Sequence, residues 1–200
     1  MLSAFTRGRV AEPARPAWNL MKTLAQTLVF WSVFLALIPS LLFEFEARLG
    51  LAGARFGAPG YPTLGAALFL AGGCLGLWSG ATMAWLGAGT PLPVDCPRSL
   101  VIAGPYRFIR NPMAVAGIGQ GVAVGAALGS PSVVLYALAG APLWNLFVRG
   151  WEERDLAARF GEPYLEYQRR IPCWYPTLSP MSRSAAEPSA AQPKGEDVGG

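Results

Sequence analysis

The sequence predicts an all-α, polytopic integral membrane protein with about four spans, a C-terminal membrane hairpin and short cytoplasmic helices. Of its 200 residues, 52% are hydrophobic and only 14% are charged, whereas a soluble domain usually carries about 25% charged residues. Four apolar stretches separated by polar segments supply the spans. The basic residues gather on alternate polar segments, which orients the spans.

The first two predicted spans are long enough to cross a bilayer unaided. One runs roughly from Leu20 to Phe43 with a single charge, and the other from Leu64 to Leu86 with none. Each exceeds the ~20 helical residues that cover about 30 Å of hydrocarbon. The first is too long for the apolar region of a cleavable signal peptide, and no small-residue cleavage site follows it.

The third and fourth apolar stretches form the predicted membrane hairpin. They run from Met113 to Leu128 and from Val133 to Val148, 16 residues each, and the turn sequence Gly-Ser-Pro-Ser joins them. This length is marginal for a full crossing, so we expect the hairpin either to dip deeply or to cross a thinned bilayer. In both cases its two ends lie on the same side.

Arginine and lysine residues mark the predicted cytoplasmic side. They precede the first span, follow the second span and fill the segment after the fourth, while the turn of the hairpin has none. This distribution predicts that both termini are cytoplasmic. The composition is typical of a prokaryotic protein, so we expect the inner membrane of a prokaryote. The predicted divisions are a flexible N-terminus 1–17, two spans in 18–92, a catalytic region 93–178 and a disordered tail 179–200.

The composition also excludes several classes of site. The chain has no histidine, the commonest metal ligand and general base. Its three cysteines are widely spaced and form no CxxC pair, so we expect neither a metal site nor a disulfide framework. Outside the tail next to the membrane, the chain has no basic stripe with interleaved aromatic residues, so we do not expect it to bind nucleic acid.

Small residues recur every four positions in two of the spans. Gly72, Gly76 and Gly80 mark one face of the second span, and glycines at the same spacing mark the third. Such stripes let helices approach closely in lipid, or they leave room for a lipid chain or a cofactor. Gln120, the only strongly polar residue inside the third span, either bonds to a neighbouring helix or lines the site.

A first polar block, from Gly104 to Met113, reads G-P-Y-R-F-I-R-N-P-M. Pro112 suits the first turn of the third span, and Asn111 before it is expected to cap that helix. On its own, Arg-Asn-Pro also fits a helix cap beside a snorkelling membrane anchor.

A second polar block follows the fourth span and begins at Glu152. The adjacent carboxylates of Glu152 and Glu153 lie where the span leaves the membrane, and they are costly there unless they are solvated or paired. A solvated helix face would also explain them. Leu156 and Phe160, four residues apart, predict a cytoplasmic helix that rests on the membrane or the hairpin, and Gly161 ends it.

The two polar blocks together resemble a known family. The order R-N-P-M, a membrane hairpin, E-E and then F-G-E-P-Y-L-E-Y-Q-R-R-I-P is similar to that of the isoprenylcysteine carboxyl methyltransferases. The phospholipid methyltransferases are their wider relatives. The resemblance covers roughly Pro93 to Pro176. It implies a multi-span helical enzyme that binds S-adenosylmethionine at the cytoplasmic face and takes a lipid substrate from the bilayer.

The resemblance also implies roles for particular residues. Glu152 would face the cofactor's positive groups, and Arg149 would lie near the substrate entrance; with Glu153 they are the catalytic candidates. The link from Arg98 to Val101 would line the cofactor. The remaining cofactor-binding candidates are Tyr106, Arg110, Asn111, Pro112, Met113, Ala114 and Tyr164.

Two positions depart from the family pattern. The common motif has histidine where this chain has Asn111, and often tyrosine where it has Ala114. Asparagine keeps a hydrogen-bonding side chain but cannot titrate, and alanine would widen the pocket. These departures bear on the identity of the substrate more than on the use of the cofactor. The helix N-terminus at Pro112 would still offer N–H groups to the cofactor's carboxylate.

The predicted function is S-adenosylmethionine-dependent methyl transfer to a lipid-like or prenylated substrate, with carboxyl O-methylation implied by the resemblance. A carboxylate acceptor needs no general base, whereas an amine or thiol would have to lose a proton to Glu152 or Glu153. Two alternatives remain, a sterol-reductase-like membrane oxidoreductase that uses NADPH and a non-enzymatic membrane scaffold. The expected partners are the bilayer and the substrate, and the sequence leaves the oligomeric state open.

Overall fold

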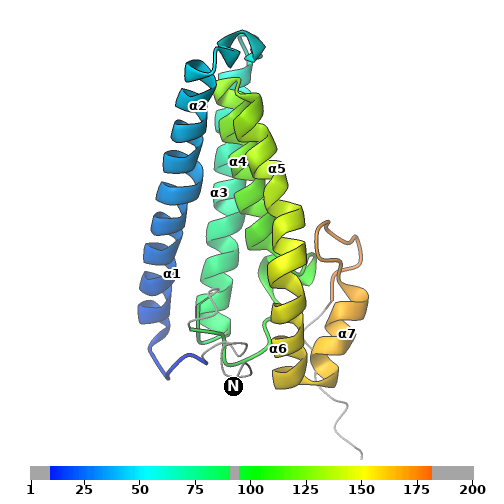
Figure 1. The fold of residues 1–200 in the computed structure, drawn as a ribbon. Helices are drawn as coiled ribbons and strands as arrows, with labels where there is room; N and C mark the ends of the chain where they lie inside the picture. The colour runs from blue at the N-terminus through cyan, green and yellow to red at the C-terminus, as the bar shows by residue number, and fades with distance from the viewer. Residues whose placement is uncertain (1–9, 91–94, 182–200) are drawn as a thin grey trace, which may run out of the picture.

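The computed structural model describes residues 10–90 and 95–181, and every regular element within these ranges is a helix (Figure 1). The elements are α1 Pro16–Phe30, the π-helix η2 Trp31–Leu37, α2 Ile38–Arg48, the 3₁₀-helix η3 Leu51–Ala54, α3 Tyr61–Leu86, the 3₁₀-helix η4 Gly104–Arg107, α4 Pro112–Leu128, α5 Pro131–Trp144, the π-helix η5 Asn145–Arg149, α6 Gly150–Phe160 and α7 Glu162–Arg170.

Three helical runs are long and apolar enough to cross a membrane. They are Pro16–Arg48, Tyr61–Leu86 and Pro131–Phe160, and they contain the first, second and fourth predicted spans. The third predicted span forms α4, which has 17 residues. At 1.5 Å per residue α4 is about 25 Å long, short of the ~30 Å of hydrocarbon. Helices that can cross a membrane are therefore confirmed, and four complete crossings stay a prediction.

The fourth predicted span is longer than the sequence suggests. α5, η5 and α6 form one continuous helix of 30 residues that ends at Phe160. The sequence places Glu152 and Glu153 just beyond the span, whereas both lie inside this helix. The helix continues because Gly150 is the only helix breaker in its last 16 residues, and a glycine costs only about 1 kcal/mol relative to alanine.

Glycines let the helices around α3 pack closely. α3 packs along α4, and α4 packs along α5. A Cβ on Gly72 would lie 2.7 Å from Cγ of Gln120, and a Cβ on Gly121 would lie 2.8 Å from Cβ of Ala137. Gln120 is 1% exposed and donates to the carbonyl of Phe69 on α3 at 3.4 Å. Of its two predicted roles, the structure therefore supports a bond to a neighbouring helix.

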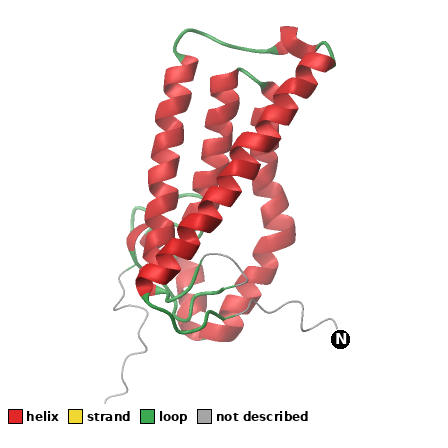
Figure 2. Ribbon diagram, turned by 90° about the vertical axis from the view of Figure 1, so that its left-hand side faces the viewer, coloured by secondary structure: helices red, strands yellow, loops and turns green. Residues whose placement is uncertain are grey.

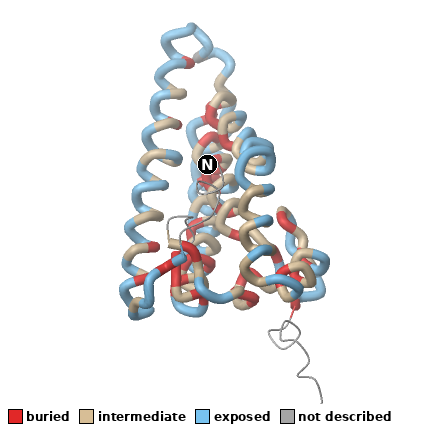
Figure 3. Tube along the Cα trace, turned by 60° about the horizontal axis from the view of Figure 1, so that its bottom comes forward, coloured by how far each residue is buried: buried red, intermediate tan, exposed pale blue. Residues whose placement is uncertain are grey.

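The long helix Pro16–Arg48 crosses the bundle at an angle (Figure 2). α1 contacts α3, and α2 contacts α5. Outward-facing side chains of the long helices, such as Leu28, Leu146 and Phe147, are apolar and exposed. Buried residues gather along the inner helix faces and around the loops at one end (Figure 3). That end, which holds η4, α6 and α7, is called the site end below.

Candidate functional site

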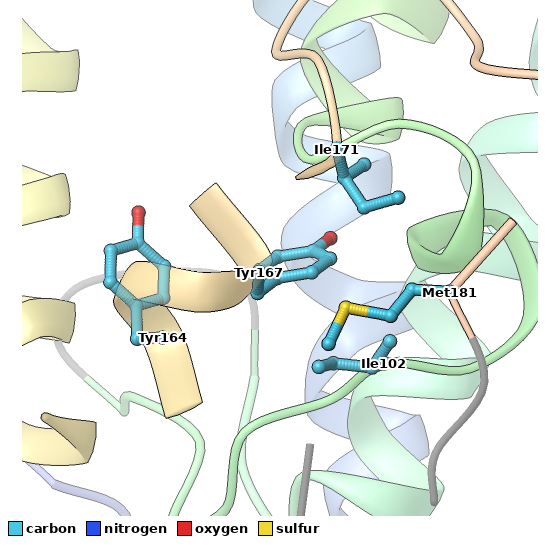
Figure 4. Packing of buried hydrophobic residues seen from close by; sticks show 5 residues of the cluster. All are labelled: Ile102, Tyr164, Tyr167, Ile171 and Met181. Atoms are coloured by element: carbon cyan, nitrogen blue, oxygen red, sulfur yellow. The ribbon is translucent and has the colours of Figure 1, made fainter. Parts of the chain in front are cut away.

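Both polar blocks meet at the site end. η4 and the start of α4 come from the first block, and α6 and α7 come from the second. A cluster of five buried hydrophobic residues joins them. Leu156 and Phe160 pack against this cluster, whereas the sequence predicts that they rest on the membrane or the hairpin. The cluster consists of Ile102, Tyr164, Tyr167, Ile171 and Met181 (Figure 4).

The C-terminal segment folds back over η4. The backbone N–H of Met181 donates to the carbonyl of Arg107 at 3.2 Å, and Nε of Arg107 donates to the carbonyl of Met181 at 3.0 Å. The N–H of Thr177 donates to the carbonyl of Phe108 at 2.9 Å. These contacts extend to residue 181, beyond the predicted start of the tail at 179. The rest of that predicted tail lies outside the described residues.

Glu153 is the polar centre of the site end. One of its carboxylate oxygens accepts from Nη1 of Arg110 and, at 2.9 Å, from Nε of Arg149. The other accepts from Nε2 of Gln168 at 2.9 Å. Charge-assisted bonds of this kind are stronger than neutral ones. Glu153 therefore joins three parts of the chain: the residues before α4, the long helix Pro131–Phe160, and α7.

Arg110 links the first polar block to the end of the second. Its side chain is 10% exposed. Besides Glu153, its Nε donates to the carbonyl of Ile171 at 2.7 Å, and its backbone N–H donates to the carbonyl of Pro172 at 2.9 Å. The R-N-P sequence and the closing I-P sequence, which lie more than 60 residues apart, are thus held against each other.

Glu152 differs from its neighbour because it makes no hydrogen bond or ion pair with the described residues. Its side chain is partly buried. The pKa of Tyr106 is raised chiefly by burial and to a smaller extent by the charge of Glu152. The Glu152 carboxylate therefore lies near the phenol of Tyr106, which stays protonated at neutral pH. A partly buried carboxylate without a partner at the end of a membrane bundle is suited to pair with a cation.

Three tyrosines surround this region as neutral groups. The hydroxyl of Tyr167 donates to the carbonyl of Tyr106 at 2.7 Å and so fixes η4 against α7. Burial raises the pKa of Tyr164 to about 12, and burial also raises the pKa of Tyr167. All three phenols therefore remain protonated near neutral pH, so they can donate hydrogen bonds but do not act as bases.

Asn111 caps α4, as the sequence predicts. Its Oδ1 accepts from the N–H of Ala114 at 3.2 Å, and its carbonyl accepts from the N–H of Val115 at 3.2 Å. Pro112, which is buried, has no N–H to offer. In the part of the chain that the structure describes, the N–H of Met113 is left as the unbonded donor in the first turn. The helix terminus can therefore offer one N–H group, fewer than the sequence suggests.

The link from Arg98 to Val101 runs beside the end of α3. The N–H of Arg98 donates to the carbonyl of Gly87 at 2.7 Å, and Val101 is 6% exposed. The cavity that Val101 lines measures about 10 Å³, which is room for about one water molecule. A role for this link in lining a cofactor stays a prediction.

Arg149 lies between the Glu153 network and a set of interfacial aromatic residues. Its Nη1 donates to Oδ1 of Asn145 at 2.9 Å, and the same oxygen accepts from Nε1 of Trp174 at 3.4 Å. Trp174 packs edge-on against Trp144, with ring centroids 5.3 Å apart. Aromatic rings with a polar edge are typical of the boundary between lipid and water.

An apolar groove opens beside these residues. It has a volume of about 600 Å³ and is lined by α3, α4 and α5, with Trp174 in its wall. Gly72, Ala116 and Gly119 leave it wide because their side chains are small or absent. Its volume falls within the ~300–1,000 Å³ of ordinary ligand pockets. Trp174 also contacts Asn145, so the groove lies next to the Asn145–Arg149 pair.

Three residues of this region are missing from the predicted site: Tyr167, Gln168 and Trp174. Tyr167 could have been found from the sequence, because it is the second tyrosine of the Y-x-x-Y pattern. The bond from Tyr167 to η4 shows that this tyrosine has a structural role. Nothing in the sequence marks Gln168, because its bond to Glu153 spans 15 residues and a change of helix. The sequence likewise gives no signal that Trp174 returns to Asn145.

The profile of one protein family, phospholipid methyltransferase, matches residues 61–163. The chain belongs to the phospholipid methyltransferase family. The matched region begins with α3 and includes the R-N-P block, Glu152 and Glu153. Family membership and the apolar helices make this protein an integral membrane methyltransferase for a lipid-like substrate. No curated protein matches the chain.

Proposed function

We propose that this methyltransferase uses S-adenosylmethionine and methylates a lipid-like acceptor at the site end. The contrast between two adjacent carboxylates carries the proposal. Glu153 accepts hydrogen bonds from three side chains, whereas Glu152 has no partner among the described residues. One carboxylate is used to hold the site together, and the other remains available for a bound cation.

The residues around Glu152 fit this cofactor. S-adenosylmethionine supplies an electrophilic methyl group on a positively charged sulfur. Glu152 would attract its sulfonium or ammonium group, and the N–H of Met113 at the start of α4 would meet its carboxylate. Methyl transfer depends chiefly on holding the reacting atoms in line. The Glu153 network would hold the residues around Glu152 in the fixed positions that this alignment needs.

Two candidates from the resemblance take a different role in this proposal. Arg110 is engaged by Glu153 and by the carbonyl of Ile171, and Tyr164 is 2% exposed in the hydrophobic cluster. We place them behind the pocket, where they set its shape. Asn111 and Met113 would form its surface, and the buried Tyr106 would lie behind them.

The apolar groove is the proposed place for a hydrocarbon chain of the acceptor. Its walls belong to the apolar helices α3, α4 and α5, and a hydrocarbon chain can lie against them. At its site end, Arg149 and Asn145 would hold the acceptor's polar group close to Glu152.

The acceptor atom is proposed to be a carboxylate oxygen. A carboxylate would pair with Arg149 and would need no general base. Because its pKa is near 4, its methylation rate should be flat across neutral pH. An amine would have to lose a proton first, and Glu152 is the carboxylate available to accept it, because Glu153 is engaged. The rate with an amine should rise with pH up to the amine's own pKa.

Calorimetric titration of the detergent-purified protein with S-adenosylmethionine tests the cofactor. Glu152→Gln should weaken binding at least ten-fold. Glu166→Gln removes a carboxylate that pairs with Arg169 and Arg170 on the surface of α7 and should bind like the wild type. Wild-type affinity in folded Glu152→Gln protein would remove Glu152 from the site.

Transfer of tritiated methyl groups identifies the acceptor. A farnesylated cysteine with a free carboxylate and phosphatidylethanolamine in mixed micelles offer the two chemistries. Methylation of the first, with a flat pH profile, supports the carboxylate proposal, and methylation of the second alone contradicts it. If the folded protein binds no S-adenosylmethionine and instead oxidises NADPH, the oxidoreductase alternative replaces the proposal.

A further inference from the structure

Four buried polar atoms on α1 have no hydrogen-bond partner in the part of the chain that the structure describes. They are both side-chain amide atoms of Asn19, Oγ1 of Thr23 and Oε1 of Gln26. Asn19 is fully buried, and Thr23 is 3% exposed. The spacing of four and three residues places them on one helix face. The contact of this face with α3 is called the α1–α3 seam below.

Unpaired polar groups weaken this seam. Within a bilayer no water is at hand to satisfy them, and each one costs free energy. α1 is therefore held against α3 less firmly than α4, whose inward Gln120 has a partner on α3.

The seam separates the bilayer from the start of α4. A Cβ on Gly80 of α3 would lie 2.9 Å from Cγ2 of Thr23 and 3.7 Å from Cε of Met113. Met113 belongs to the first turn of α4, in the proposed cofactor region. On its other side α1 exposes apolar residues such as Trp18 and Leu24. Met113 therefore lies next to the contact between Thr23 and Gly80, and apolar residues of α1 are exposed on the other side of that helix.

The long helix is anchored at both ends and irregular in the middle. Near its start, Lys22 forms an ion pair with Asp95. Near its end, Glu46 accepts from Oγ of Ser130 at 2.8 Å and from the N–H of Ser132 at 2.9 Å. Between these anchors the helix has π geometry over Trp31–Leu37. Such irregular segments are weak points in a helix and often occur at functional sites.

We infer that α1 is a lateral gate for the lipid substrate. It swings about Trp31–Leu37 while α2 stays fixed by Glu46, and the Lys22–Asp95 pair is its latch. In the open state α1 has moved away from α3, and its row of polar side chains, Asn19, Thr23 and Gln26, faces the space between the two helices. The substrate's polar headgroup then passes along Asn19, Thr23 and Gln26 to reach Met113, and the stripe gains the hydrogen bonds that it lacks when closed.

The identity of the passing lipid rests on the proposed function, whereas the movement of α1 can be tested without it. The family match begins at Tyr61, so α1 lies outside the matched residues.

Thiol labelling in phosphatidylethanolamine and phosphatidylglycerol vesicles tests the movement. In a Cys74→Ser background, which removes the exposed native thiol, Asn19→Cys is compared with Ala123→Cys. Both native side chains are fully buried, and Ala123 lies on α4. We expect N-ethylmaleimide to react at least ten-fold faster with the Asn19→Cys protein. Adding Lys22→Ala should accelerate this reaction at least three-fold further.

Equal, slow labelling of the two positions would show that α1 does not open and would overturn the gate. If Asn19→Cys fails to fold, Thr23→Cys replaces it, because the two side chains of threonine and cysteine are close in size. Faster labelling at Ala123 than in the seam would overturn the proposal as well.

A disulfide across the seam tests the link to catalysis. In Thr23→Cys/Gly80→Cys protein the two side chains face each other at the 2.9 Å approach described above, which suits a disulfide. Oxidation should leave S-adenosylmethionine affinity unchanged, lower methyl transfer to vesicle lipid at least ten-fold, and be reversed by dithiothreitol. Full transfer by the oxidised protein would overturn the gate. Loss of cofactor binding in the reduced protein would count against the proposed function instead.

Discussion

The site end and the α1–α3 seam are two polar, buried regions of one membrane protein, and they treat their polar groups in opposite ways. At the site end, Glu153 and Arg110 bond to each other, and each has at least one further partner. In the seam, Asn19 and Thr23 have none among the described residues. A satisfied network makes a rigid unit, while unpaired groups weaken an interface. The difference indicates that the site end keeps its side chains in fixed positions. It also indicates that α1 can move away from α3 at the seam.

Breaking the site-end network should have the largest effect. Arg110→Leu leaves the carbonyl of Ile171 without its side-chain donor and Glu153 without one of its two cations. Because the pair is largely buried, we expect a loss of about 3 kcal/mol in the free energy of unfolding. Circular dichroism during denaturant unfolding in detergent measures it. Arg169→Leu, which removes a cation from exposed ion pairs, should leave the unfolding midpoint unchanged; an equal drop in both variants would contradict the network's role.

Tyr167→Phe should have the next largest effect. It removes the donor to the buried carbonyl of Tyr106 without changing the packing of the ring. Leaving that acceptor unpaired should cost about 2 kcal/mol and should weaken S-adenosylmethionine binding, since η4 loses its tie to α7. Calorimetry and unfolding on the same sample measure both. Tyr175→Phe, at an exposed side chain, is the control, and an effect of the same size there would refute the prediction.

Asn111→Ala should cost about 1 kcal/mol, because the cap of α4 is lost. Asn111→Asp keeps an accepting oxygen and should retain most of the stability. The two variants separate the capping role from a role in binding. If Asn111→Asp is stable but binds S-adenosylmethionine much more weakly, the side chain also faces the cofactor's carboxylate, and the added charge repels it.

The smallest predicted effect has the opposite sign. Gln26→Met replaces an unpaired buried oxygen in the seam with an apolar side chain of similar length. Removing an unsatisfied group should leave the free energy of unfolding unchanged or raise it by up to about 1 kcal/mol. A clear loss of stability would mean that Gln26 has a partner, and the contrast between the two regions would then weaken.

Local signals in the sequence predicted much of the fold. The apolar stretches gave the long helices, and Asn111, Pro112 and Gly161 gave helix boundaries that the structure confirms. Each of these depends on residues within a few positions, so the sequence contains the whole cause. The continuation of the last long helix through Glu152 was not predicted, because charged residues suggested a boundary where the backbone has no reason to stop.

The candidate site was predicted only in outline. The residue types and their order placed Glu152 and Glu153 in one region with the R-N-P block, and the family match agrees with that grouping. The roles of the two carboxylates could not be separated, because adjacent helical residues point about 100° apart and either could have met the arginines.

The sequence by itself determined that this chain forms apolar helices with capped ends and that its polar residues gather in two blocks. Only the tertiary structure decided that Glu153 is engaged while Glu152 has no partner among the described residues. The partners of Glu153 include Arg110, which lies 43 residues away, and Gln168, which lies 15 residues away across a turn. The same holds for the seam, where burial of Asn19 and Thr23 without partners depends on how α1 lies against α3. Helix formation is a local matter of hydrogen bonds and side-chain pattern, whereas the pairing of polar groups depends on distances that only the packed bundle sets.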